Sequence, residues 1–273
     1  RMEVQELPYM KMFTMIAGIM HLMRKIFYHG YIQNPKPMNK FLLLSIIFFS
    51  LSCNSGKMSS KVYIQGGGTL NDWANLSKYA ESNRELKKHF DVNRVVFMGN
   101  SITEGWYNFN PDFFIENPFV NRGIGGQTTP QMLIRFKPDV VNLKPKAVVI
   151  LAGINDIAGN TGPMEIENIA ENIFSMTEIA KANNIEVYIC SVLPAKDFPW
   201  SPGLNPAEKV ISLNTILENY CKENNIKYVD YYSKMNDGNG GLKVPEFTSE
   251  DDLVHPNKQG YSVMESVLLS TLD

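Results

Sequence analysis

The chain has 273 residues, of which 44% are hydrophobic and 20% are charged, and its formal net charge is −2. This composition is typical of a globular protein with one sizeable core, and the lack of a basic block argues against a nucleic-acid partner. The cysteines have neither C-x-x-C nor His/Cys ligand spacing, so we expect no zinc site and no cofactor. We interpret Cys190 and Cys221 as small buried hydrophobic residues.

The amino-terminal part of the chain has the pattern of a targeting signal. We interpret residues 1–37 as an upstream segment rather than a folded module and leave them out of the fold prediction. The segment 38–53 has a basic start, a short apolar run and small polar residues, which is typical of a secretory signal. The apolar run 41–49 is shorter than the roughly 20 residues that span a bilayer, which argues against a transmembrane helix. A buried core segment is the alternative interpretation of this run.

The signal segment ends on Cys53, and in this it resembles bacterial lipoprotein signals, although Ser50 stands where that pattern usually has Leu. The resemblance implies an exported, periplasmic or cell-surface lipoprotein, held at a membrane only through lipid on Cys53. We expect residues 54–69, which are polar and rich in glycine, to form a tether, and the folded domain to span 70–273.

Strand and helix patterns alternate through that domain. An amphipathic helix is expected over 71–89. We then expect strands at 94–98, 119–122, 147–151, 185–190 and 227–230, and helices at 128–136, 163–182, from 205 onward and at 256–270. Repeated strand–helix units predict an α/β fold with a parallel sheet covered on both faces. No second domain and no internal repeat is visible.

Polar groups follow several of these strands. Ser101 comes just after the apolar run 95–98, at the carboxyl end of a strand, where ligands bind in open α/β sheets. The turn 121–128 is rich in glycine and can offer backbone N–H groups to an anion. Asn155 follows the strand 147–151 and carries an amide that can stabilise negative charge.

A fourth group lies just before the last helix. The spacing of Asp252 and His255 lets one carboxylate orient the imidazole and leave its Nε2 free as a base. Asp251 is the alternative partner for this imidazole. Beyond residue 37 the chain has only one other histidine, His89, so a serine hydrolase has little other choice of base.

Together these four groups resemble the sequence blocks of the SGNH hydrolases, the GDSL esterase/lipase family. The blocks are Gly99-Asn-Ser-Ile102, Gly126 in the glycine turn, Gly153-x-Asn155 and Asp252-x-x-His255. The resemblance covers about 70–273. It implies a flavodoxin-like three-layer α/β/α sandwich with a five-stranded parallel sheet.

The family resemblance also implies the roles of the site residues. Ser101 would be the nucleophile, His255 the base and Asp252 its orienting carboxylate. The backbone N–H groups of Ser101 and Gly126 and the Asn155 amide would form the oxyanion hole. Two positions depart from the family pattern, because Asn100 and Gln127 stand where the family usually has Asp, and we expect both to change the polarity beside the site. Asp156 is expected to brace its loop rather than act on substrate.

These features predict a serine esterase that acts on short acyl groups, acetyl first, carried on carbohydrate. No long, apolar, lid-like helix is visible near the site segments. The aromatic residues Trp106, Tyr107 and Trp200 are candidates for a surface that stacks on sugar rings, with Phe198 beside Trp200 in the loop 193–202. An acyltransferase, or a catalytically silent anchored protein that binds carbohydrate, is the alternative.

Overall fold

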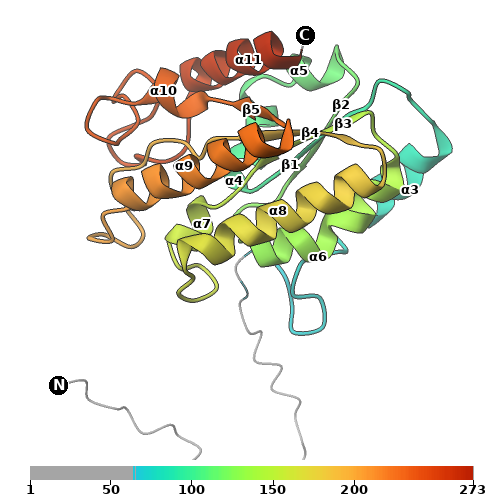
Figure 1. The fold of residues 1–273 in the computed structure, drawn as a ribbon, viewed down its shortest axis with the longest axis horizontal. Coiled ribbons are helices and arrows are strands. Elements are labelled where there is room, and N and C mark those ends of the chain that lie inside the picture. The colour runs from blue at the N-terminus through green and yellow to red at the C-terminus, as the bar shows by residue number, and fades with distance from the viewer. Residues whose placement is uncertain (1–63, 65, 273) are drawn as a thin grey trace, which may run out of the picture. The chain divides into compact units, whose positions relative to one another are not determined.

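The computed structural model describes residue 64 and residues 66–272 (Figure 1). The expected upstream segment, the signal segment and Cys53 lie outside the described residues. Within the described part of the chain, no helix is both long and apolar enough to cross a membrane.

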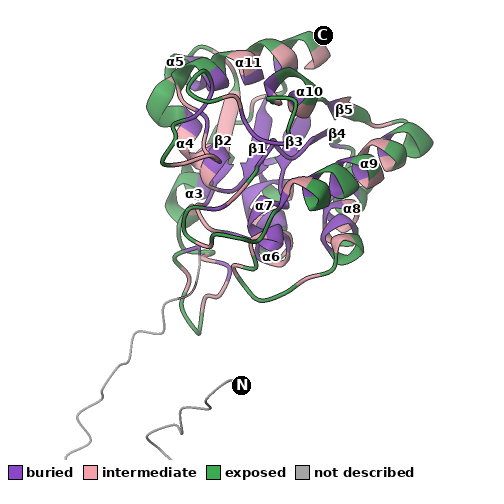
Figure 2. Cartoon of the chain, turned by 90° about the vertical axis from the view of Figure 1, so that its left-hand side faces the viewer, coloured by how far each residue is buried: buried purple, intermediate pink, exposed green. Residues whose placement is uncertain are grey.

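Five parallel strands form a sheet in the order β2-β1-β3-β4-β5. They are β1 (Val95–Gly99), β2 (Phe119–Gly123), β3 (Ala147–Leu151), β4 (Glu186–Cys190) and β5 (Lys227–Val229). Every residue of β1 and β3 is buried, as expected of central strands with helices on both faces, and Figure 2 shows this buried centre. The predicted α/β fold with a five-stranded parallel sheet is confirmed.

Right-handed crossovers decide which face of the sheet each helix covers. From β1 the chain steps through α4 to the edge strand β2, and it then returns the other way to β3, β4 and β5. Helices α4 and α11 therefore pack together on one face, while α6, α8 and α9 form a row on the other (Figure 1). The helices of these two layers are α4 (Ser101–Phe109), α11 (Lys258–Leu272), α6 (Thr129–Asp139), α8 (Ile166–Ala182) and α9 (Ala207–Asn224).

Shorter elements complete the described chain, namely α3 (Ala80–Lys88), α5 (Asp112–Ile115), the 3₁₀ turn η1 (Val141–Leu143), α7 (Ile154–Ile157) and α10 (Tyr231–Met235). The direction in which successive strands are added to the sheet reverses between β1 and β3, although all strands run parallel. In an open α/β sheet this reversal leaves a crevice for ligands outside the carboxyl ends of the strands. The fold therefore directs attention to the segments that follow β1, β2 and β3.

The helix expected over 71–89 begins only at Ala80, so its first half is wrong. The Asp72 carboxylate accepts hydrogen bonds from the backbone N–H groups of Leu76 and Ser77, at 2.6 and 3.0 Å. Bonds of this kind compete with those of a helix. The domain also begins earlier than expected, because Gly66, which was assigned to the tether, packs against the side chain of Gln127.

Candidate active site

Ser101 is the first residue of α4 and directly follows the central strand β1. The side chain of Asn100 caps this helix by accepting the Ile102 N–H at 3.2 Å. The last residue of the strand is Gly99, and a glycine is needed there because a Cβ would overlap the side chain of Thr103. The N–H of a first helical residue has no acceptor within its helix, so the Ser101 N–H is available to a ligand.

His255 reaches Ser101 from the far end of the chain. Its Nε2 lies 2.8 Å from Ser101 Oγ, although 154 residues separate the two. On the other side of the ring, Nδ1 lies 2.8 and 3.0 Å from the two carboxylate oxygens of Asp252. A proton on Nδ1 that is donated to this carboxylate leaves Nε2 free to accept the serine proton.

The loop that carries His255 is held in an unusual backbone conformation. Leu253 has a φ of +64°, in the left-handed region that is uncommon for residues other than glycine. The Asp252 carboxylate also accepts the backbone N–H of His255 at 2.8 Å. Thr248 Oγ1 donates to the His255 carbonyl at 2.9 Å. These bonds fix Asp252, rather than Asp251, beside the imidazole.

The glycine turn after β2 passes beside Ser101. The Gln127 N–H donates to the Ile124 carbonyl at 3.3 Å, and Gly126 has a φ of +78°, as the third residue of a type II turn requires. A Cβ at Gly125 would lie 3.6 Å from the Cβ of Ser101, which shows how close the two segments come. Within the described residues, no group accepts a hydrogen bond from the Gly126 N–H.

Asn155 and Asp156 both lie in α7, which follows β3, and both bond to residues at or just after the end of the glycine turn. The Asn155 amide is buried and donates one hydrogen bond, of 2.9 Å, to the Gln127 carbonyl, which leaves its second N–H. Asp156 accepts from the Thr129 N–H at 2.9 Å and from the Thr129 hydroxyl at 2.6 Å. Its expected bracing role is confirmed by these bonds, and burial raises its pKa to about 6.

The structure thus brings Ser101, His255, Asp252, the glycine turn and Asn155 together at the carboxyl edge of the sheet. A hydroxyl, an imidazole hydrogen-bonded to a carboxylate, and several hydrogen-bond donors meet there. This set of groups is suited to acyl transfer through a serine.

Trp106 does not belong to this surface, and its predicted stacking role is wrong. Its side chain is 1% exposed and stacks on Phe113 with ring centroids 5.2 Å apart. Its Nε1 donates to Glu265 at 2.9 Å. Ile102 and Trp106 are one helical turn apart in α4 and both face the core, whereas the neighbouring Tyr107 is 45% exposed.

Trp200, unlike Trp106, is exposed and lies near His255. It is 48% exposed, and its ring centroid is 6.1 Å from that of His255. Phe198 is fully buried, with its ring centroid 5.2 Å from that of Trp200, so the expectation that Phe198 adds contact surface is wrong. An exposed aromatic face therefore borders the candidate base, supported from below by a second ring.

A buried arginine was missed in the sequence. The guanidinium of Arg135 donates to the carbonyls of Gly99 and Arg122, both at 2.8 Å, and thus joins the ends of β1 and β2. It also donates to the side chain of Gln127, so this side chain turns inward rather than beside the site. The one signal in the sequence was Asp139, four residues later, which forms an ion pair with Arg135. Pairs at this spacing usually lie on exposed helix faces, so the signal did not point to a buried arginine.

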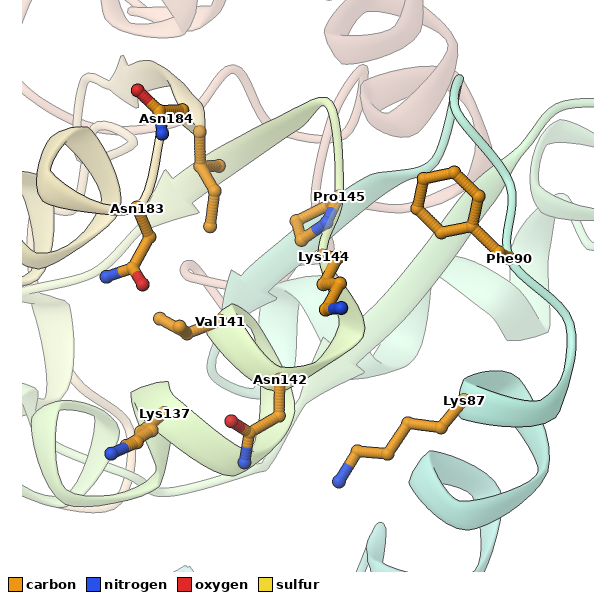
Figure 3. A pocket seen from close by; sticks show the side chains of 10 residues that line it. Lys87, Phe90, Lys137, Val141, Asn142, Lys144, Pro145, Asn183 and Asn184 are labelled. Atoms are coloured by element: carbon orange, nitrogen blue, oxygen red, sulfur yellow. The ribbon is translucent and has the colours of Figure 1, made fainter.

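A hollow of about 830 Å³ lies at the opposite, amino-terminal edge of the sheet. Figure 3 shows its lining, which includes Phe90 and the lysines Lys87, Lys137 and Lys144. It is remote from Ser101, because it adjoins the segments that precede β1, β3 and β4. Within residues 66–272, no group of three or more His, Cys, Asp or Glu side chains could hold a metal ion.

The comparisons with known proteins agree with this geometry. Residues 97–263 match the GDSL-like lipase/acylhydrolase family. The structure is similar to that of a GDSL-like lipase from Bacteroides thetaiotaomicron VPI-5482, with 47% identity, a TM-score of 0.69, and coverage of 72% of this chain and 96% of that one. It is also similar to a candidate acylhydrolase from Bacteroides fragilis NCTC 9343, with 48% identity, a TM-score of 0.68, and coverage of 73% and 96%.

A more distant relative is a lipoprotein of Bacillus subtilis (strain 168) named YqeF, which is 26% identical over 156 residues. This match covers 50% of the chain and 64% of the relative. The family match spans more than half of the chain and includes all four sequence blocks. The chain belongs to the GDSL-like lipase/acylhydrolase family, the SGNH hydrolases, and is a hydrolase that acts on esters.

Proposed function

We propose that the protein hydrolyses short-chain carboxylic esters, acetyl esters of carbohydrates first, through an acyl-enzyme formed on Ser101. The observation that carries this proposal is the contact of 2.8 Å between Ser101 Oγ and His255 Nε2, with Asp252 on the far side of the ring. A serine hydroxyl is a weak nucleophile unless a base is adjacent, and this contact supplies the base.

The proposed reaction has two halves. Ser101 Oγ attacks the ester carbonyl while His255 Nε2 takes the serine proton, and the new C–O bond gives a tetrahedral oxyanion. The Ser101 and Gly126 N–H groups and the second N–H of Asn155 donate to this oxyanion. His255 then gives its proton to the leaving alcohol as the old C–O bond breaks. Water, deprotonated by the same imidazole, releases the acid and restores the serine.

The borders of the site favour small acyl groups. Polar groups line this side of the site, because the backbone of the glycine turn lies close to Ser101 and the Asn155 amide donates to the Gln127 carbonyl of that turn. The exposed ring of Trp200 near His255 suits stacking on a sugar. A more distant solved structure, the acetyl xylan esterase AlAXEase, has 20% identity and a TM-score of 0.52 and shares the fold alone.

The test is turnover of p-nitrophenyl acetate by the full chain and by Ser101→Ala. We expect activity in the first and its loss in the second, with Ser262→Ala, at an exposed serine of α11, as the matched control. Equal turnover by Ser101→Ala would refute the assignment of Ser101 as the nucleophile. A silent carbohydrate-binding protein would instead bind glycans and resist labelling by a fluorophosphonate.

The acyl group and acceptor need a second set of measurements. In a series of p-nitrophenyl esters, kcat/KM should fall from acetyl to octanoyl, and the reverse order would overturn the preference for short chains. Acetylated xylan and O-acetylated sialic acid should both be assayed. Acetyl transfer to a sugar alcohol that outruns hydrolysis would identify an acyltransferase instead.

We further propose that the protein is exported and carries lipid on Cys53. The support is the signal-like segment 38–53 and the distant relative that is named a lipoprotein. A single acyl chain binds membranes only marginally, so stable anchoring needs a further chain. Cys53→Ser should move the protein from the membrane fraction to the soluble one. Continued membrane association of that variant would contradict the anchor.

A further inference from the structure

We propose that residues 66–79 form a clamp that positions the turn bearing the Gly126 N–H, and that Glu104 is the positioning residue through which it acts. Residues 66–79 lie before the stretch 97–263 that matches the family, whereas Glu104 lies within it. The inference rests on the proposed function, since it concerns the oxyanion hole of that reaction. We call residues 66–79 the N-terminal clamp and residues 123–127 the glycine turn.

The first anchor is an ion pair that reaches the turn through α4. Lys78, in the clamp, pairs with one carboxylate oxygen of Glu104, and the other oxygen accepts the Gly125 N–H at 2.6 Å. Tyr79, also in the clamp, donates its hydroxyl to the Gly123 carbonyl. Two alternate residues of the glycine turn are therefore held from the clamp side.

The second anchor is the side chain of Gln127. Its Nε2 donates to the Ala74 carbonyl at 2.8 Å, and its oxygen accepts from buried Arg135. Gly66 packs so closely on this side chain that a Cβ at position 66 would collide with it. Gln131 adds a bond of 3.0 Å to the Trp73 carbonyl. The clamp thus buries the residue that directly follows Gly126.

These anchors hold the residues on both sides of Gly126 and leave the Gly126 N–H available to the substrate oxygen. The Ile124 N–H donates to the Gly99 carbonyl at 3.1 Å, which ties the turn to the strand of Ser101. The Gly126 carbonyl accepts from Asn160 at 3.1 Å. Because Gly125 and Gln127 are held on either side, the direction of the Gly126 N–H is fixed by bonds that the clamp supplies or supports.

The charge of Glu104 explains why Lys78 takes part. A carboxylate close to a developing oxyanion raises the energy of that oxyanion, because like charges repel. The Lys78 ammonium neutralises the carboxylate while leaving one of its oxygens for the Gly125 N–H. The side chains of Lys78 and Glu104 are 28% and 39% exposed, so changing either opens no cavity in the core.

Glu104→Ala removes the acceptor for the Gly125 N–H and is the main test. Since a misplacement of about 1 Å can cost about 10²-fold, we expect kcat on p-nitrophenyl acetate to fall about 10- to 100-fold with little change in KM. Glu104→Gln keeps an acceptor oxygen and should recover most of kcat. The midpoint of thermal unfolding and the loss of rate at acidic pH should stay as in the wild type.

A double variant tests whether the clamp acts through Glu104. Lys78→Met alone should lower kcat, but Lys78→Met combined with Glu104→Ala should be no slower than Glu104→Ala. Independent, multiplying losses would overturn the linkage. The matched control is Lys88→Met, which removes the exposed ion pair with Glu85 in α3 and should leave kcat unchanged.

Ser101→Ala, measured beside these variants, separates this inference from the proposed function. An active Ser101→Ala protein would refute the function itself. An inactive Ser101→Ala protein together with a Glu104→Ala protein of wild-type kcat would refute only the clamp. A Glu104→Ala protein that loses kcat and thermal stability together, without recovery in Glu104→Gln, would assign Glu104 to folding and also overturn the inference.

Discussion

The indole Nε1 of Trp106 donates a hydrogen bond of 2.9 Å to Glu265, and this bond joins the helix that begins at Ser101 to the helix that follows His255. The same carboxylate accepts from Asn110 at 3.0 Å. Helices α4 and α11 are therefore joined by partly buried hydrogen bonds. A residue expected at the substrate surface instead links these two helices.

Trp106→Phe tests this tie. It keeps an aromatic ring but deprives Glu265 of a donor, so the free energy of unfolding should fall by about 1–3 kcal/mol. We expect kcat to fall as well, because the position of α4 relative to α11 loosens. Urea unfolding and p-nitrophenyl acetate kinetics measure the two effects. Trp200→Phe is the matched control, and a Trp106→Phe protein that is as stable as the wild type would contradict the tie.

Asn155→Ala tests the proposed role of Asn155 as the third oxyanion donor. Removal of one such donor typically lowers kcat by about 10²–10³, and we expect a loss in this range with the fold intact by circular dichroism. Asn224→Ala, at an exposed amide that caps the end of α9, should change nothing. A loss smaller than about threefold would assign Asn155 to holding the Gln127 carbonyl alone.

Asp252→Asn tests the orientation of the imidazole. An amide partner favours the wrong tautomer, and in a comparable triad this change costs about 10⁴-fold in kcat. The rate of the wild type should also fall at acidic pH, because a protonated imidazole cannot accept the serine proton. Asp251→Asn is the neighbouring control. A wild-type rate that is flat from about pH 5 to pH 8, with chemistry rate-limiting, would count against His255 as the base.

Asp156→Asn tests the buried carboxylate. Because burial raises the pKa of Asp156 from 3.8 to about 6, the folded protein holds a proton that the unfolded chain releases. The extra stability from this bound proton is fully present below the unfolded-state pKa of 3.8, and it is lost as the pH rises through the folded-state pKa of about 6. The free energy of unfolding of the wild type, relative to the variant, should therefore fall by up to about 3 kcal/mol between about pH 4 and pH 6.

Chemical unfolding of the Asp156→Asn protein at several pH values measures this difference. Asp112→Asn, at an exposed carboxylate, is the control and should follow the wild type. Parallel curves for the wild type and Asp156→Asn across that range would mean that this carboxylate is ionised throughout.

Trp200→Ala tests the sugar-stacking role. Loss of the exposed ring should raise KM on acetylated xylan, while turnover of p-nitrophenyl acetate, which has no sugar, should change little. Phe90→Ala removes an exposed ring at the opposite edge of the sheet and is the control. Unchanged kinetics of Trp200→Ala on the glycan would remove the stacking role and leave the chemistry in place.

The strands and the order of the site segments could be predicted because their signals are local. The strand Ala147–Leu151 is buried on both faces, so its sequence is a continuous apolar run without alternating polar residues. The helix α6 begins where its cap predicts, since Thr128 and Gln131 form a capping box. The carboxyl ends of parallel strands share one edge, so the site segments could be expected together.

The remaining features depend on contacts between distant segments. Arg135 is buried because carbonyls from two strand ends and Asp139 surround it, and no local pattern records those partners. In the sequence Trp106 cannot be told from an exposed aromatic residue, and it is buried by rings of distant segments, among them Phe113 and Tyr261. The segment 71–79 has helical spacing, but its backbone bonds the glycine turn and its own Asp72 instead.

The separation of 154 residues between Ser101 and His255 has a consequence for biosynthesis. Closing so long a loop is slow relative to local contacts, so the serine is in place before the imidazole can reach it. During synthesis the strands emerge first and α11 last. A nascent chain that ends before residue 252 holds the proposed nucleophile without Asp252 and His255. The proposed reaction therefore requires the late part of the chain that carries Asp252 and His255.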